Sequence, residues 1–364
     1  MSSLFTPLTV GSLQLPNRVF MAPLTRCRAT PDTHVPIVEL IAPYYAARAT
    51  AGLIIAECSM IAPGASAFYA EPGVYSLEQL AAWKVITDAV HAQGGKIFCQ
   101  IWHAGRAAHP ELNRGAETVS SSAVVMTKTT HTPFGKAAPV TPRALGTHEV
   151  DAVVQLFAVA ARNCVELGGF DGVEIHGANG YLVDQFLKDG VNRREDSYGG
   201  CVENRVRFLM DVLAAVGAAI GFDKLAVRLA PLNTENDIAD SDPFGLATHV
   251  ANALNELPPL AYVHILRHDL LGQLQGDVEG IFRRHYKGVL VSNASYTRDE
   301  ANTAIATGRV DAIAFGKPFI ANPDLVARFQ QSKVELNDVD RATFYKGGAV
   351  GYLDYPTLVS SVAP

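Results

Sequence analysis

One short segment of the sequence carries an imidazole, a carboxamide and a phenol close together. His176 and Asn179 are three residues apart across a turn that contains Gly177, so their two hydrogen-bond donors can converge on one carbonyl oxygen. Fixed donors aimed at a point where negative charge develops stabilise that charge. Tyr181 follows two residues later and offers a phenolic proton at close range, which suits a general acid. The competing interpretation is structural, with a core histidine, a turn asparagine and a core aromatic.

Polar side chains also stand where short apolar runs of the sequence end. They are mostly amide, hydroxyl, imidazole and guanidinium donors, and few are acids. The residues in these positions are Thr25, Arg26, Glu57, Cys58, Gln100, Trp102, His103, Arg228, Gly316 and Lys317. Donors that face one opening suit an anionic or carbonyl-rich ligand. A flavin is such a ligand, because it carries a phosphate, two ring carbonyls and, when reduced, a negative charge at N1.

Arg228 places a charge inside an apolar run of the sequence, residues 226–231. Burying a guanidinium is costly unless it is paired, so either a carboxylate or an anionic cofactor should lie beside it. His103, His109 and Glu57 could in principle bind a metal, but their spacing fits no compact ligand motif. We therefore expect no metal site.

Eight short apolar runs alternate with amphipathic stretches along the chain. The runs are rich in Val, Ile, Leu or Ala without polar alternation, as expected for strands buried on both faces. They cover residues 18–24, 52–58, 96–102, 172–176, 224–230, 262–266, 288–292 and 311–316. Helices are predicted over 77–93, 150–167 and 203–220, and a capping-box pattern at 297–300 precedes another at 301–306.

Eight strand–helix units with parallel pairing predict an α/β protein with a closed (β/α)8 TIM barrel. An open doubly wound sheet is the alternative, but it favours a glycine-rich phosphate fingerprint that the sequence lacks. Active-site residues of a barrel stand at the C-terminal ends of its strands, which is where the polar residues above lie.

Two segments do not fit the repeat. Residues 5–16 are predicted to form an N-terminal hairpin that plugs the bottom of the barrel. Residues 106–147 form a long, turn-rich insertion after the third strand, with possible strands at 120–123 and 124–130. A loop this long inside a compact domain is usually functional, so we expect a lid over the barrel mouth. The whole chain, residues 1–364, is predicted to be one barrel domain.

Composition and charge argue against several classes of protein. The 364 residues are 48% hydrophobic, and 30 Lys and Arg against 36 Asp and Glu give a net charge of −6, which does not favour binding to nucleic acid or to an anionic membrane. No signal sequence or membrane span is recognisable. Five scattered cysteines indicate mostly buried thiols in a reducing compartment. We expect a cytoplasmic monomer or homodimer that acts on a small molecule without nucleic acid or membrane.

Several motifs strongly resemble those of the Old Yellow Enzyme family. The main one is His-Gly-Ala-Asn-Gly-Tyr-Leu-Val-Asp-Gln-Phe-Leu at 176–187, followed by matching segments at 192–200 and 203–208. Further matches cover residues 17–26, 100–106, 315–325 and 351–356. They run in the family's order along nearly the whole chain. The resemblance implies an FMN-containing barrel that reduces activated C=C bonds by ping-pong hydride transfer, with NADPH or NADH as the hydride donor.

The resemblance also implies roles for single residues. The cofactor-binding residues would be Pro23, Leu24, Thr25, Cys58, Gln100, His176, Arg228, Ala294, Ser295, Gly316 and Lys317, of which the last four match the phosphate-binding ends of strands seven and eight. The substrate pocket would be lined by Thr25, Tyr69, Trp102, His176, Asn179 and Tyr352. In catalysis, His176 and Asn179 would hold the substrate's carbonyl or nitro oxygen, and Tyr181 would supply a proton to Cα.

The chain departs from the family's pattern at a few positions. Cys58 stands where relatives usually have Gly or Ala, and Lys317 replaces a frequent arginine. Residues 293–295 replace a glycine-richer turn. The pair His176 and Asn179 is one of two common pairings, the other having a second histidine.

The substrates implied by the resemblance are enone-type, namely α,β-unsaturated carbonyl or nitro compounds. The alternative is that the same flavin chemistry acts mainly on quinones, nitro-esters or lipid endoperoxides. Two other classes compete with this interpretation: a barrel lyase that uses a metal or a Schiff base, and an FMN-binding protein without activity.

Overall fold

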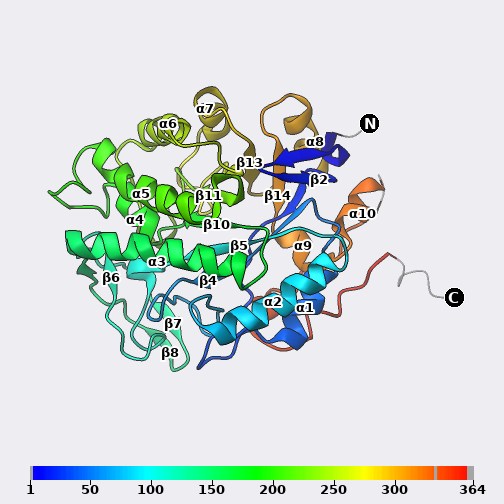
Figure 1. Cartoon of the computed structure of the whole chain (residues 1–364), viewed down its shortest axis with the longest axis horizontal. Helices are drawn as coiled ribbons and strands as arrows, with labels where there is room; N and C mark the ends of the chain where they lie inside the picture. The colour runs from blue at the N-terminus through cyan, green and yellow to red at the C-terminus, as the bar shows by residue number, and fades with distance from the viewer. Residues whose placement is uncertain (1–2, 332–333, 359–364) are drawn as a thin grey trace.

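Eight parallel strands close into a barrel in the computed structural model, which describes residues 3–331 and 334–358 (Figure 1). Around the barrel the order is β10-β11-β12-β13-β14-β3-β4-β5. The strands are β3 (Val19–Met21), β4 (Leu53–Met60), β5 (Ile97–Trp102), β10 (Gly172–Gly177), β11 (Leu225–Leu229), β12 (Tyr262–Leu266), β13 (Leu290–Asn293) and β14 (Ala312–Phe315). Every residue of these strands is buried except Asn293. All eight predicted strands are present, which confirms the barrel and excludes the open sheet.

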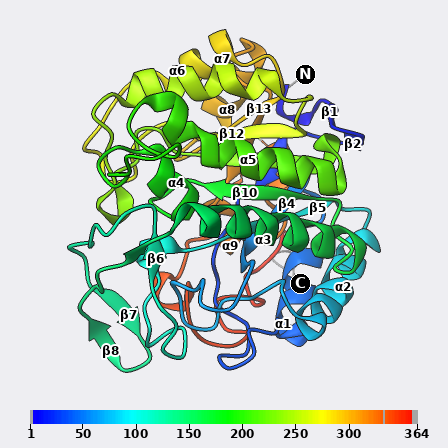
Figure 2. The same ribbon diagram turned by 60° about the vertical axis from the view of Figure 1, so that its left-hand side comes forward.

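Helices form the outer layer of the barrel, most of them in the crossovers between strands and the last two after β14. They are α1 (Val38–Ala46), α2 (Leu77–His91), α3 (Thr147–Glu166), α4 (Leu182–Leu187), α5 (Val202–Ile220), α6 (Pro243–Ala253), α7 (Val278–His285), α8 (Arg298–Ala306), α9 (Lys317–Ala321) and α10 (Leu325–Gln330). The capping box expected before α8 is present, with the Thr297 hydroxyl accepting from the Glu300 N–H. Figure 2 shows α3 and α5 side by side in front of β10. Over residues 3–331 and 334–358, no helix combines the length and the apolarity needed to cross a membrane.

The N-terminal hairpin closes one end of the barrel, as predicted. Its strands are β1 (Leu8–Val10) and β2 (Leu13–Leu15), which pair antiparallel. Gly11 turns between them with φ +55°, and a Cβ there would lie 1.8 Å from the Asp223 carbonyl oxygen. Val10 and Leu15 pack with Phe20, Phe98 and other inward side chains of the barrel. Four of the five cysteines are buried, and Cys201 is exposed.

The insertion at residues 106–147 carries only short strands. They are β6 (Val119–Ser120) paired with β9 (Arg143–Ala144), and a hairpin of β7 (Thr130–Thr132) and β8 (Gly135–Ala137). The strands predicted at 120–123 and 124–130 are therefore wrong, because this polar stretch is anchored by side chains rather than by a ladder; the Ser121 hydroxyl, for example, donates to the Gln185 carbonyl at 2.7 Å. The β7–β8 hairpin projects to one side of the barrel (Figure 2).

Candidate active site at the mouth of the barrel

Strand register brings the predicted polar residues together at one end of the barrel. His176 on β10 is aligned with Arg228 on β11, and Glu174 on β10 is aligned with Gln100 on β5. Gln100 is fully buried, and His176 and Arg228 are nearly so. Since parallel strands end at the same edge, side chains that are far apart in sequence lie at one end of the barrel.

The turn after β10 places Asn179 and Tyr181 beside His176. Asn179 and Gly180 both lie in the left-handed region, with φ +59° and +76°, which asparagine and glycine tolerate. The Gly180 N–H donates to the Asp184 carboxylate at 2.9 Å. This hydrogen bond links the turn to the first residues of α4 and holds Tyr181 beside His176.

Three rings meet at this point and fix the phenol of Tyr181. The Tyr181 ring meets Trp102 edge-on, with centroids 4.4 Å apart, and meets His176 at 5.0 Å. Burial raises the pKa of Tyr181 above its ordinary value, so the phenol keeps its proton. Burial, aided by the positive charge of Arg228, holds the pKa of His176 well below its ordinary value, so the imidazole is neutral. The Nδ1 atom of His176 is buried without a hydrogen-bond partner among the described residues.

A buried chain of hydrogen bonds runs across the barrel beneath this site. The Cys58 thiol donates to Gln100 Oε1 at 2.8 Å, and Gln100 Nε2 donates to Glu174 Oε1 at 2.7 Å. Glu174 Oε2 and His264 Nδ1 are 2.9 Å apart. Burial raises the pKa of Cys58 well above its ordinary value, so the sulfur is a protonated donor. Glu174 and His264 were not predicted; the alternation of side chains along β10 puts Glu174 on the same face as His176 and could have indicated it.

Arg228 has a buried donor that the described residues do not satisfy. One of its Nη atoms donates to Asn293 Oδ1 at 3.2 Å, and its Nε is buried without a partner. Within residues 3–331 and 334–358, no carboxylate forms an ion pair with it. Because a buried guanidinium is costly without a partner, an anionic ligand is favoured over the carboxylate alternative. This donor set therefore fits a flavin ring, whose carbonyls and anionic reduced form accept hydrogen bonds.

The turn after β13 is shaped for an anion. Ala294 and Ser295 have φ +94° and +54°. Arg267 donates to both of their carbonyl oxygens, at 2.8 and 3.0 Å, and its guanidinium lies 3.7 Å from the Tyr296 ring centre. Because peptide groups are planar and trans, the N–H groups that follow these carbonyls point away from Arg267. Consecutive N–H groups in such a turn form an anion-binding concavity.

The predicted cofactor-binding residues at the ends of β3 and β14 lie on neighbouring strands. Pro23, Leu24 and Thr25 follow β3 and are half-buried. Leu24 lies next to Gly316, where a Cβ would be 3.4 Å from a Leu24 methyl. Lys317, the first residue of α9, is exposed. Arg267 was not predicted, because nothing in its spacing distinguished it from other loop arginines.

Tyr352, which was predicted to line the substrate pocket, lies elsewhere. Tyr352 is fully buried, and its ring stacks on Tyr44 at 4.0 Å under the guanidinium of Arg26. It therefore packs the C-terminal segment against α1 and does not line open space. The side chain from this segment that lies at the mouth is Tyr345, which is 56% exposed and stacks on Phe68 at 5.6 Å.

Two other predicted lining residues, Trp102 and Tyr69, lie beside Phe68 in space and in sequence, respectively. Trp102 is fully buried behind Tyr181, and its ring is 6.2 Å from Phe68. Tyr69, on the loop after β4, is half exposed. An unbroken set of ring contacts thus leads from His176 through Trp102 and Phe68 to Tyr345.

Two buried arginines hold the segment that carries Tyr345. Arg26 donates to the Phe344 and Gly351 carbonyls at 3.0 and 3.2 Å. Arg28 donates to the Thr343 and Lys346 carbonyls, both at 2.8 Å. Arg26, one of the strand-end residues, is thus a structural anchor for the far end of the chain.

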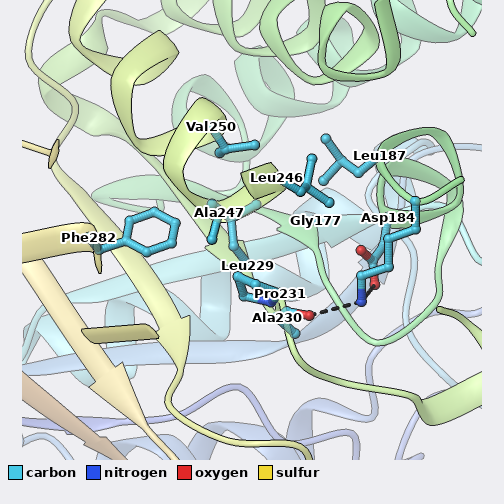
Figure 3. A pocket seen from close by; sticks show the side chains of 11 residues that line it. Gly177, Asp184, Leu187, Leu229, Ala230, Pro231, Leu246, Ala247, Val250 and Phe282 are labelled. Carbon is cyan, nitrogen blue, oxygen red and sulfur yellow. Dashed lines mark hydrogen bonds and ion pairs between the residues drawn. The ribbon is translucent and has the colours of Figure 1, made fainter. Parts of the chain in front are cut away.

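A small cavity lies behind the strands rather than at the mouth (Figure 3). Its volume is about 10 Å³, and its lining is mostly apolar, including Leu229, Leu246 and Phe282. Lys188 is among the residues that line it and donates to the Ala230 carbonyl at 3.0 Å. The space accommodates at most about one water molecule, so it is not a substrate site.

Comparison with known proteins agrees with this geometry. The model of the NADH:flavin oxidoreductase / NADH oxidase family matches residues 3–336. A probable flavin mononucleotide-dependent alkene reductase of Leishmania infantum is 44% identical over 358 residues, covering 97% of this chain and 96% of that protein. Rice 12-oxophytodienoate reductase 1 is 41% identical over 365 residues, covering 98% and 93%.

Solved structures give the same result. The Old Yellow Enzyme of Trypanosoma cruzi superposes with a TM-score of 0.95 at 42% identity, covering 98% of this chain and 99% of that one. Morphinone reductase superposes with a TM-score of 0.91 at 40% identity, covering 99% and 98%. Another structure of morphinone reductase contains tetrahydroNAD.

The fold and the donor-lined mouth define an FMN-dependent oxidoreductase built on a (β/α)8 barrel. The chain belongs to the NADH:flavin oxidoreductase / NADH oxidase family, as a member of the Old Yellow Enzyme group, which reduces activated C=C bonds. The expected family, cofactor and enzyme class are confirmed. The lyase and the inactive scaffold are not supported.

Proposed function

We propose that the mouth of the barrel binds α,β-unsaturated carbonyl or nitro compounds and that His176, Asn179 and Tyr181 carry the substrate chemistry. The relatives named alkene reductase and 12-oxophytodienoate reductase support this substrate class. Quinones, nitro-esters and lipid endoperoxides are the disfavoured alternative. The enzyme acts as one barrel unit in the cytoplasm, as a monomer or homodimer, with the insertion at 106–147 beside its mouth.

The observation that carries the proposal is the disposition of the donors around one point. Asn179 Oδ1 already accepts a hydrogen bond from Asn233 at 3.1 Å, so the Asn179 amide N–H groups are left for a ligand. His176 is neutral, and among the residues that the structure describes its Nδ1 has no hydrogen-bond partner that would compete with a substrate. Two donors on one oxygen polarise the conjugated C=C bond and stabilise the enolate-like charge that develops.

Tyr181 holds the proton for the other end of the double bond. Its ring is fixed between Trp102 and His176, and its pKa is raised by burial. A phenol that stays protonated in the resting state gives its proton only when a strongly basic carbon forms. This makes Tyr181 a general acid rather than an anion that would repel the enolate.

FMN, when bound, supplies the hydride chemistry, accepting from NADPH or NADH and donating to the substrate. Pro23, Leu24, Thr25 and Cys58 would border its ring system, and Gln100, His176 and Arg228 would meet its polar edge. Ala294, Ser295, Gly316 and Lys317 would hold its phosphate. Thr25, Tyr69 and Trp102 complete the space left for the substrate.

Binding of a phenol to the oxidised holoenzyme tests the oxygen-binding pair. A phenolate mimics the enolate oxygen, so His176→Ala and Asn179→Ala should each weaken binding about 10- to 100-fold, the effect of a lost hydrogen bond to a charged group. FMN content and melting temperature serve as folding controls. Unchanged phenol affinity in both variants would refute the assignment.

A further inference from the structure

We propose that Asn233 is a positioning residue that fixes the carboxamide of Asn179 with its N–H groups toward the substrate oxygen. This inference rests on the proposed function, since it concerns the same oxygen-binding pair. Asn233 lies in the loop after β11 and is 1% exposed.

The orientation of Asn233 is set by a backbone group. Its Oδ1 accepts a hydrogen bond from the Leu270 N–H at 3.3 Å. A backbone N–H can only donate, so the oxygen of Asn233 must face Leu270. A carboxamide has its oxygen and its NH₂ on opposite branches. The NH₂ group of Asn233 is therefore turned toward Asn179.

The orientation of Asn179 follows from that of Asn233. Asn233 Nδ2 donates to Asn179 Oδ1 at 3.1 Å, and Asn236 Nδ2 donates to the Asn179 backbone carbonyl at 2.8 Å. With its oxygen occupied on the Asn233 side, the NH₂ group of Asn179 faces the other way. An asparagine turned by 180° would present an oxygen to the substrate oxygen, which would repel it.

A buried ion pair links the backbone segments that carry these two asparagines. Lys188 Nζ donates to the Asn233 backbone carbonyl at 2.9 Å and lies 3.5 Å from the Asp184 carboxylate. Asp184 accepts from the N–H of Gly180, the neighbour of Asn179. Lys188 and Asp184 are each 1% exposed. The backbones of Asn179 and Asn233 are thus held at a fixed separation, as the hydrogen bond between their side chains requires.

Two substitutions of similar size distinguish orientation from packing. Asn233→Asp keeps an acceptor for Leu270 but offers a second acceptor to Asn179, so the Asn179 amide should turn and present its oxygen to the ligand. Asn233→Leu removes both hydrogen bonds and leaves the Asn179 amide free to take either orientation. We expect the affinity of the oxidised holoenzyme for phenol to fall about tenfold or more in Asn233→Asp. In Asn233→Leu it should fall only about twofold, since the Asn179 amide is still correctly oriented in half of the molecules.

A purely structural role predicts the reverse order, because Asp is nearly isosteric with Asn and Leu removes all polar contacts. Equal losses, or a larger loss with Leu, would therefore overturn the proposal. Melting temperature and FMN content are followed in parallel, and Asn255→Asp, a half-buried asparagine between α6 and α7, is the matched control that should leave phenol affinity unchanged.

A double-mutant cycle separates reorientation from simple charge repulsion. In an Asn179→Ala background, Asn233→Asp should have no further effect on the phenol dissociation constant. A further tenfold loss in that background would show that the new carboxylate repels the phenolate directly and would overturn the proposal. If Asn179→Ala alone leaves phenol affinity unchanged, the failure lies in the proposed function, which falls together with this inference.

Discussion

The ring of Tyr181 meets the ring of Trp102 edge-on, with centroids 4.4 Å apart and ring planes at 88°. Edge-to-face contacts of this kind hold an aromatic ring in one orientation. Trp102 ends β5 and Tyr181 follows β10, and these two strands are neighbours in the barrel. The ring of Tyr181, our proposed proton donor, lies in the turn after β10 and is therefore held by a side chain of the sheet.

Substrate binding should be insensitive to pH around neutrality. The pKa of His176 is well below its ordinary value because of burial and the positive charge of Arg228, so the imidazole is neutral from about pH 6 to 8. Phenol dissociation constants, corrected for ionisation of the phenol itself, should be constant over that range. A step near pH 6.5 that disappears in His176→Gln would contradict a neutral His176.

The lowered pKa of His176 also makes the free energy of unfolding depend on pH. Because the folded-state pKa of His176 lies below that of the unfolded chain, the unfolded chain binds the proton first. The free energy of unfolding should therefore fall as the pH drops below about 6.5. In urea titrations at pH 7.5 and 5.5, His176→Gln should lose less stability between the two pH values than the parent protein does.

Arg228 should set the affinity for FMN. Arg228→Met removes the buried guanidinium and its unsatisfied Nε donor, so we expect FMN to bind about 10- to 100-fold more weakly, as for loss of a hydrogen bond to a charged group. The readout is the fluorescence of released FMN in an equilibrium titration. Arg284→Met, at an exposed position on α7, is the control. Equal FMN affinity in the Arg228→Met and Arg284→Met variants would show that Arg228 does not contribute to FMN binding.

The fold could be predicted from the sequence much further than the site could. Eight uninterrupted apolar runs are a strong signal, and the C-terminal end of each run located His176, Gln100 and Arg228 correctly. The insertion could not be predicted, because polar segments such as 120–130 have no period and are held by contacts with distant residues.

Residues that act across strands also escaped prediction. Asn233 and Asn179 meet only because β10 and β11 are neighbours, and their spacing of 54 residues carries no signal. In the C-terminal segment, Tyr345 and Tyr352 look equivalent in sequence. Only the buried arginines that hold this segment decide that Tyr345 faces the mouth and that Tyr352 stacks on Tyr44.

That distinction between the two tyrosines can be measured. Tyr345→Ala should change KM for bulky enones several-fold with little effect on melting temperature, because the ring is mostly exposed. Tyr352→Ala should cost about 3–5 kcal/mol of stability, as for other large buried aromatics, and act on KM only through unfolding. A destabilised Tyr345→Ala protein with unchanged KM would reverse the two roles.

The most direct test of the account is a stopped-flow comparison of the two half-reactions in Tyr181→Phe. The phenol is held ready as a proton donor, and the loss of a general acid lowers a rate by about 10²- to 10⁴-fold. Flavin reduction by NADPH or NADH needs no proton from Tyr181 and should stay near the parent rate, whereas flavin reoxidation by an enone should slow by about that factor. Equal slowing of both half-reactions, or no slowing of either, would contradict the proton-donor role of Tyr181.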